Sequence, residues 1–224
     1  QHSRTRPSAA SSCWQSWRRW KMADLLLTPL CEGEWEGRKI NSDFRPMVWL
    51  ANQYLRGTPD KDPFLFSQEA FHRFFREDVP LPQSGEAFQS MLRFYVGGEA
   101  ATPEARRSVS SSAGSHEIAF DYASDAPYIV AAFQQTYGID LTASTMHWWR
   151  FRALFLSLPE DTLMHKIMCW RTADLSGMQS EERQRYELLR GAYALPADVK
   201  GGRRIATVAD HDAAFLARFQ HTGE

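Results

Sequence analysis

The chain has 224 residues, of which 43% are hydrophobic and 24% are charged, a composition typical of a globular protein. Its 26 Lys and Arg residues nearly balance 27 Asp and Glu residues, so the overall charge lacks the basic footprint of nucleic-acid-binding proteins. The longest apolar cluster, Leu25 to Leu27, ends at Thr28 and Pro29, far short of the roughly 20 residues that cross a bilayer, and three scattered cysteines fit a reducing compartment better than a disulfide framework.

The first 21 residues differ in composition from the rest of the chain. Residues 1–21 contain no Asp or Glu, but they carry five Arg or Lys side chains and three Trp. This composition is typical of an organellar targeting peptide or a basic membrane-surface segment, and translated sequence upstream of a start site gives it as well. We favour the last interpretation, because Met22 opens an abrupt change to ordinary globular composition. We therefore expect 1–21 to be a non-native or disordered leader.

The segment 22–98 carries the signals of one hairpin and three helices. Gly37 lies at the centre of an alternating stretch, residues 34–40, which predicts a short β-ribbon that uses the freedom of glycine at positive φ. Beyond it, apolar residues recur at helical spacing in three runs bounded by capping residues, Gly or Pro. The predicted helices run from Phe44 to Leu55, from Ser67 to about Glu77, and from Ser84 to about Val96.

A small and polar stretch, residues 99–115, follows these helices. Its serines and glycine supply too little apolar surface to offset the entropy of ordering, which predicts a flexible linker. The linker separates the N-terminal segment from a C-terminal helical module, residues 116–195. The alternative is one domain with a long loop. Residues 196–224 form a weakly patterned tail with one short helical run, 207–219.

The C-terminal module is predicted to consist of consecutive helices. The first is capped at Ser124 or Asp125 and ends at Gly138. The second starts at Thr142 or Ser144 and stops before Pro159, with apolar residues on more than one face. Two further helices follow, one capped by Asp161 or Thr162 and one starting near Ser180. The sequence as a whole predicts a mostly α fold of helical bundle-like modules with a short N-terminal β-hairpin.

The densest aromatic cluster lies on the second of these helices. Arg guanidinium groups form cation–π contacts with Trp faces, and Trp and Arg are enriched in binding hot spots. One interpretation is a protein-binding surface, and the more common one is a core helix with its arginines in water. The two are compatible if each face of the helix serves one role. The candidate protein-binding residues are Trp148, Trp149, Phe151, Arg152 and Phe155.

The sequence offers no constellation for catalysis or metal binding. His165 and Cys169 are four residues apart, but no second ligand pair completes a four-ligand metal site. No phosphate loop and no Gly-x-Ser-x-Gly elbow is present. Helix capping explains the remaining carboxylates better than acid–base chemistry does: Asp121, Asp125, Glu160 and Asp161. We therefore predict no catalytic residue, no metal, no cofactor and no enzymatic activity.

Two stretches resemble a bacteriophage family known as gene product fifteen, found in tailed phages and prophages. The first runs from Trp35 to Arg45, where Asn-Ser-Asp-Phe-Arg stands in place of the Asn-Thr-Asp-Phe-Arg of the family. The second is more specific and matches the family in order and spacing from Phe120 to Tyr186. Its centre is the run His147-Trp148-Trp149-Arg150-Phe151-Arg152-Ala153-Leu154. The resemblance extends from about Met22 to Leu189, and everything after Leu195 lies outside it.

The resemblance implies a role in phage tail assembly. Genes of the family commonly lie just ahead of the tape-measure gene, the place occupied by tail assembly chaperones. Such a chaperone coats the long helical tape-measure protein until tail-tube subunits replace it. We expect the tape-measure protein or other tail proteins as partners, in the cytoplasm of the bacterial host, with self-association left open. A partner helix would bind through anchors at helical spacing, in a groove beside Trp148, Trp149, Phe151, Arg152 and Phe155.

Two other functions compete with this one. A structural component of the tail would remain in the finished particle, whereas a chaperone would be released. A helical DNA-binding or regulatory protein is disfavoured by the near-zero net charge and by the lack of a clear helix-turn-helix pattern. We expect neither nucleic acid nor a membrane as a partner.

Overall fold

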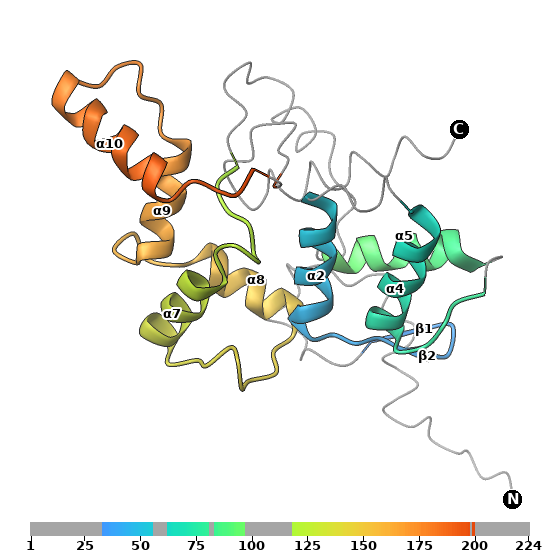
Figure 1. Ribbon diagram of the computed structural model, residues 1–224. Coiled ribbons are helices and arrows are strands. Elements are labelled where there is room, and N and C mark those ends of the chain that lie inside the picture. Colours follow the sequence, from blue (N-terminus) through green and yellow to red (C-terminus); the bar gives the residue numbers. More distant parts are fainter. Residues whose placement is uncertain (1–32, 56–61, 81–82, 97–117, 198, 200–224) are drawn as a thin grey trace, which may run out of the picture.

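The computed structural model describes residues 33–55, 62–80, 83–96, 118–197 and 199. In these ranges the chain forms seven helices and a two-stranded antiparallel hairpin (Figure 1). This confirms the mostly α fold with an N-terminal β-hairpin. No helix in these ranges is long and apolar enough to cross a membrane. The predicted leader 1–21, linker 99–115 and helix 207–219 lie outside the described residues.

The hairpin consists of β1 (Glu34–Trp35) and β2 (Arg38–Lys39), with Glu34 opposite Lys39. Its two turn residues both have positive φ, 45° at Glu36 and 85° at Gly37. Positive φ at both central residues matches the right-handed twist of the flanking strands in a two-residue turn. Gly37 therefore turns the ribbon where the sequence predicted.

Three helices follow the hairpin: α2 (Phe44–Leu55), α4 (Pro63–Phe75) and α5 (Ser84–Tyr95). The ranges of α2 and α5 confirm the prediction. The predicted start of α4 at Ser67 is wrong, because Asp62 caps the helix earlier by accepting the backbone N–H of Leu65 at 3.0 Å. Pro63 occupies the first helical position, where the missing N–H has no cost.

Four helices form the C-terminal part: α7 (Ala126–Tyr137), α8 (Trp148–Leu156), α9 (Leu163–Thr172) and α10 (Ser180–Ala192). Two predicted boundary residues are confirmed. Gly138 ends α7 in the left-handed conformation, at φ 67°, and Thr162 caps α9 by accepting the N–H of His165 at 3.3 Å. α10 also begins at the predicted serine, with two glutamates in its first turn, where the helix dipole favours negative charge.

The start of α8 differs from the prediction. The capping signals at 142–144 predict a helix there, whereas α8 begins at Trp148. The residue before it, His147, is extended and forms an isolated antiparallel bridge with Asp43. Its Nδ1 accepts the backbone N–H of Trp149 at 3.2 Å and so caps the helix. Pairing with a distant segment therefore overrides the local signal.

One hydrophobic core contains side chains from both sides of the 99–115 segment. Phe44 of α2 stacks on Phe151 of α8, with ring centroids 4.6 Å apart. α2 also contacts α4, and α8 contacts α7. The described parts of the chain thus share a single core.

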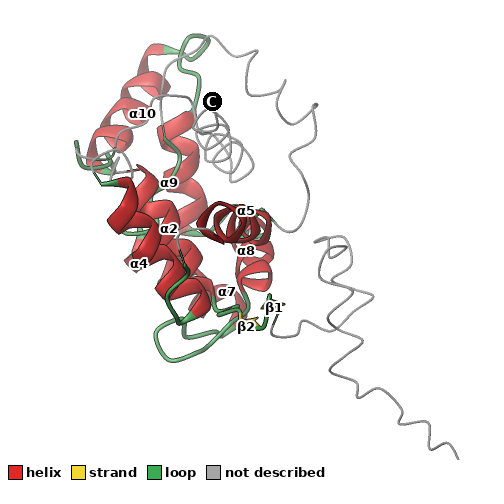
Figure 2. Cartoon of the chain, turned by 90° about the vertical axis from the view of Figure 1, so that its right-hand side faces the viewer, coloured by secondary structure: helices red, strands yellow, loops and turns green. Residues whose placement is uncertain are grey.

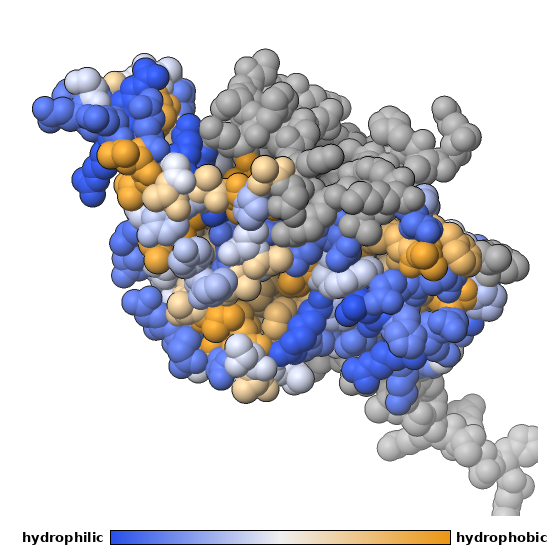
Figure 3. Space-filling model, in the orientation of Figure 1, coloured by the Kyte–Doolittle hydropathy of each residue, from blue (hydrophilic) through white to orange (hydrophobic). Residues whose placement is uncertain are grey.

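The pair α9–α10 lies at the end of the molecule opposite the hairpin (Figure 1 and Figure 2). α10 packs against α9, but none of its residues is buried, and its surface is mostly hydrophilic (Figure 3). Leu188 is an apolar exception on this hydrophilic surface, because it is 70% exposed. α10 therefore covers part of α9 without entering the core.

Candidate functional site

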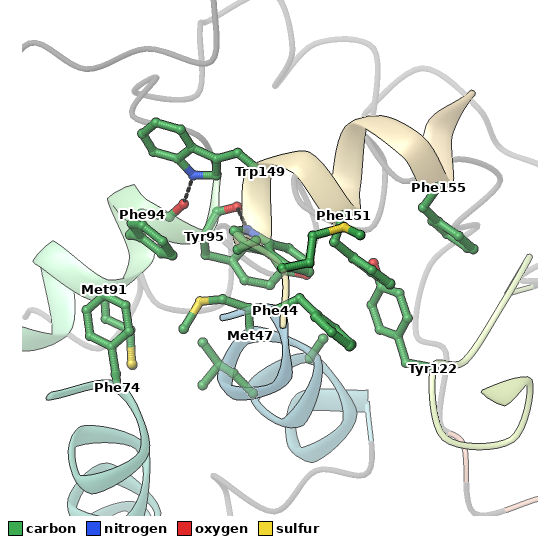
Figure 4. Packing of buried hydrophobic residues seen from close by; sticks show 14 of the residues in the cluster. Phe44, Met47, Phe74, Met91, Phe94, Tyr95, Tyr122, Trp149, Phe151 and Phe155 are labelled. Carbon is green, nitrogen blue, oxygen red and sulfur yellow. Dashed lines mark hydrogen bonds between the residues drawn. The ribbon is translucent and has the colours of Figure 1, made fainter. Parts of the chain in front are cut away.

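The candidate protein-binding residues all lie on α8, but most of them point into the protein. Four of these aromatic residues are at most 2% exposed: Trp148, Trp149, Phe151 and Phe155. Figure 4 shows three of them, Trp149, Phe151 and Phe155, packed among other buried side chains. Arg152 is half-buried and donates Nη1 to the carbonyl of Val96 at 3.3 Å, whereas Arg150 is exposed. In this structure the expected aromatic groove is therefore filled core, and the four rings are not available to a partner.

The two indole groups of α8 hold the C-terminal end of α5. Trp148 donates Nε1 to the carbonyl of Tyr95 at 2.7 Å. Trp149 donates Nε1 to the carbonyl of Phe94, also at 2.7 Å (Figure 4). The last carbonyls of a helix have no partner within the helix. The indoles supply these buried acceptors with donors, and they fix α8 across the end of α5.

Phe151 lies at the centre of an aromatic stack that joins α8 to α2 and α7. Its ring stacks on Phe44 at 4.6 Å and on Phe133 of α7 at 5.2 Å between centroids, with interplanar angles of 9° and 13°. Phe155, one turn further along α8, contacts Phe120 edge to face at 5.1 Å. The aromatic density of this stretch thus has a packing role.

The segment 41–45, which the resemblance singles out, begins with a cap for α4. The backbone N–H of Asn41 donates to the carbonyl of Phe74 at 2.6 Å, and its side-chain amide donates to the carbonyl of Arg73 at 3.1 Å. Both acceptors belong to the last turn of α4. Asn41 therefore caps the C-terminal end of α4, and it also lines the pocket described below.

Asp43 and Arg45 connect the start of α2 to the loop before α8. The Asp43 carboxylate accepts the backbone N–H of Arg45 at 3.0 Å, the backbone N–H of Met146 at 3.1 Å, and the Arg45 guanidinium at 3.0 and 3.1 Å. Arg45 in turn donates Nη2 to the carbonyls of Leu141 and Ser144. The motif thus fastens two segments that are about a hundred positions apart in the sequence.

A buried ion pair between α7 and α9 was missed by the sequence analysis. Asp125 was expected to cap α7, but its side chain makes no capping bond there. It accepts instead two hydrogen bonds from Arg171, at 2.7 and 2.9 Å. The two side chains are 1% and 7% exposed. Asp125 thus occupies the N-cap position of α7, one of the two residues predicted for it, but its carboxylate binds a partner 46 positions away and caps no helix N–H.

Further hydrogen bonds engage other donors and acceptors of this pair. Arg171 donates Nη1 to the carbonyl of Ala119 at 3.0 Å and Nε to the carbonyl of Tyr193 at 2.7 Å. The Asp125 carboxylate accepts the backbone N–H of Asp121 at 2.9 Å. A buried charge pair is tolerated when its other hydrogen-bonding positions are filled. The network ties the segment before α7 and the residue after α10 to one point.

A concave pocket of about 560 Å³ lies where the hairpin, the end of α4 and the start of α8 meet. Lys39, Arg76 and His147 are among the residues that line it. Loss of solvation lowers the pKa of His147 from 6.5 to about 4, so its ring is neutral at neutral pH. Because Nδ1 accepts a hydrogen bond, Nε2 carries the ring hydrogen. The pocket therefore offers donors and positive charge.

The residues weighed for metal binding do not form a site within the described ranges. There, no group of three or more His, Cys, Asp or Glu side chains is arranged to hold a metal ion. Partial burial, and next the charge of Glu160, raise the pKa of the Cys169 thiol. A protonated thiol is a poor ligand and a poor nucleophile.

Fold and site together define a mostly helical protein in which an aromatic core and a buried ion pair hold the helices around a polar surface pocket. The chain belongs to a bacteriophage family: the family model described as Bacteriophage Gp15 protein matches residues 68–195, more than half of the chain. The match confirms the resemblance, although it begins after the 35–45 stretch and extends to Leu195. No curated protein and no solved structure matches the chain.

Proposed function

We propose that this phage protein acts in tail assembly, as a chaperone that binds the tape-measure protein before the tail tube polymerises. Membership in the Gp15 family is the observation that carries the proposal, together with the tail-module gene position that the resemblance implies. The protein acts by binding rather than by catalysis, in the cytoplasm of the bacterial host.

The burial of the α8 aromatics moves the binding surface to other residues. A partner helix binds through apolar anchors that are exposed before it arrives. Large apolar side chains that are 42 to 70% exposed occur at the start of α4, around the turn between α8 and α9, and on α10: Phe64, Leu65, Leu156, Leu163 and Leu188. We expect the tape-measure protein to contact the chain at these positions.

Co-expression with the tape-measure protein from the same phage tests the proposal. We expect the tape-measure protein to become soluble and to co-purify with this chain. Single replacements Phe64→Glu, Leu156→Glu and Leu188→Glu identify the anchor surface, and Gln184→Glu is the matched control on α10, because it adds a carboxylate without removing an apolar side chain. If the tape-measure protein stays insoluble although this chain is folded, the chaperone proposal fails.

A further inference from the structure

The pocket between the hairpin, the end of α4 and the start of α8 carries two cations on its wall. Lys39 lies at the end of β2, and Arg76 directly follows α4. Both residues are exposed. Arg76 has φ 58°, an uncommon conformation for a residue other than glycine, and its Nη2 donates to Oδ1 of Asn41 at 3.3 Å. This bond holds the guanidinium beside the pocket.

The two carboxylates of the pocket wall are each placed next to an arginine. Asp43 accepts two bonds from the Arg45 guanidinium, at 3.0 and 3.1 Å. Glu77 lies 3.7 Å from Nε of Arg38. Neither carboxylate forms an ion pair with Lys39 or Arg76, so both cations are free to pair with an anionic group of a ligand.

Neutral hydrogen-bond donors also line the pocket beside these cations. Nε2 of His147 carries a hydrogen and forms no hydrogen bond with any described residue. Within the described ranges, the backbone N–H groups of Ser42 and Thr145 also lack a partner, and both residues line the pocket. Backbone N–H groups and imidazole N–H are the donors that commonly bind carboxylates beside Lys or Arg.

Apolar side chains lie beside these donors in the same wall. Ile40, Phe75 and Met146 line the pocket and are 2%, 2% and 7% exposed. The pocket volume falls within the roughly 300–1,000 Å³ of ligand sites, which combine apolar lining with a few polar groups. Because these side chains are nearly buried, the groups that a ligand meets are the cations and the N–H donors, and a ligand that carries carboxylates satisfies both.

We propose that this pocket binds an acidic peptide segment of another protein, with one carboxylate between Lys39 and Arg76. The neutral His147 ring donates Nε2–H to the same segment. This pocket is a different surface from the exposed apolar anchors. It binds the acidic segment whether or not the partner is the tape-measure protein.

Titration of the full chain with a fluorescein-labelled peptide of alternating glutamate and valine tests the proposal. The glutamine–valine peptide is the matched control ligand. We expect the acidic peptide to bind at least about tenfold more tightly than the control, because charge-assisted hydrogen bonds are lost with the carboxylates. Binding should weaken with added salt, and the amide resonances of Ser42, Thr145 and His147 should shift in NMR spectra.

Two double variants with matched changes in charge show where the peptide binds. Lys39→Gln with Arg76→Gln should weaken binding at least about tenfold, since both charge-assisted contacts are removed. Arg93→Gln with Lys166→Gln removes the same charges from exposed positions of α5 and α9 and should leave binding unchanged. Equal binding of the two peptides overturns the proposal, as does an equal effect of the two double variants. The proposal is also overturned if inorganic phosphate produces the same NMR shifts and displaces the peptide at equal concentration.

Discussion

Breaking the Asp125–Arg171 pair tests how the C-terminal helices are held together. Arg171→Met removes the guanidinium and keeps most of the side-chain length, and it leaves a buried carboxylate without a counter-charge. Breaking a buried pair in this way costs about 3–5 kcal/mol, a large share of the roughly 5–15 kcal/mol that stabilises a domain. Asp125→Leu should cost a similar amount, because the guanidinium, which is 7% exposed, then lacks its carboxylate.

The double variant gives the sharper result. With both charges gone, no uncompensated charge remains, and the cost that persists is that of the backbone groups of Ala119, Asp121 and Tyr193 that lose partners. The double variant should therefore be less destabilised than the sum of the single variants, with a coupling free energy of about 1–3 kcal/mol. Urea unfolding followed by tryptophan fluorescence measures all three values.

An exposed ion pair supplies the control for this cycle. The side chains of Arg183 and Glu187 on α10 are 55% and 51% exposed and lie 2.9 Å apart. Arg183→Met should change the free energy of unfolding by less than about 1 kcal/mol. If the two buried replacements instead add to within about 0.5 kcal/mol, the charges do not act as a pair and the reasoning is refuted.

Three further predictions concern single residues. Because the folded-state pKa of His147, about 4, lies below its ordinary 6.5, the unfolded chain binds the proton first as the pH falls. Up to about 3 kcal/mol of stability that is present above pH 6.5 is therefore lost as the pH falls toward 4. His147→Asn keeps a capping acceptor and should remove this contribution of His147 to the difference between unfolding curves at pH 4 and 7. Trp149→Phe leaves the Phe94 carbonyl without its 2.7 Å donor and should cost about 1–3 kcal/mol in urea unfolding. The control Trp170→Phe should cost less, because the Trp170 indole N–H has no partner among the described residues. An equal cost of the two variants would contradict the capping role of Trp149. Gly138→Ala places a Cβ at φ 67° and should cost about 1 kcal/mol by thermal melting, whereas Gly177→Ala, with open space around it and no positive φ, should not.

Features fixed by neighbouring residues were predictable from the sequence. Gly37 and Gly138 both occupy positions with positive φ, and the hydroxyl of Thr162 bonds an N–H three residues on. Each depends on local chemistry that a short stretch of sequence displays. The hairpin and the boundaries of most helices follow from such signals.

Features fixed by distant partners were not predictable. The start of α8 moves to Trp148 because Asp43 pairs with the residue before it. Asp125 is the N-cap residue of α7, but its carboxylate binds Arg171 and makes no capping bond. Aromatic density also cannot tell a buried face from a binding face. The indole N–H groups of α8, which could have served a partner, meet carbonyls at the end of α5.

The presence of this protein in tail assembly intermediates and in finished particles, measured by quantitative mass spectrometry, tests the central claim most directly. The account predicts that it is isolated together with the tape-measure protein before the tube forms and that it is absent from purified virions. Stoichiometric recovery from virions, without association with free tape-measure protein, would contradict the chaperone role and identify a structural component of the tail.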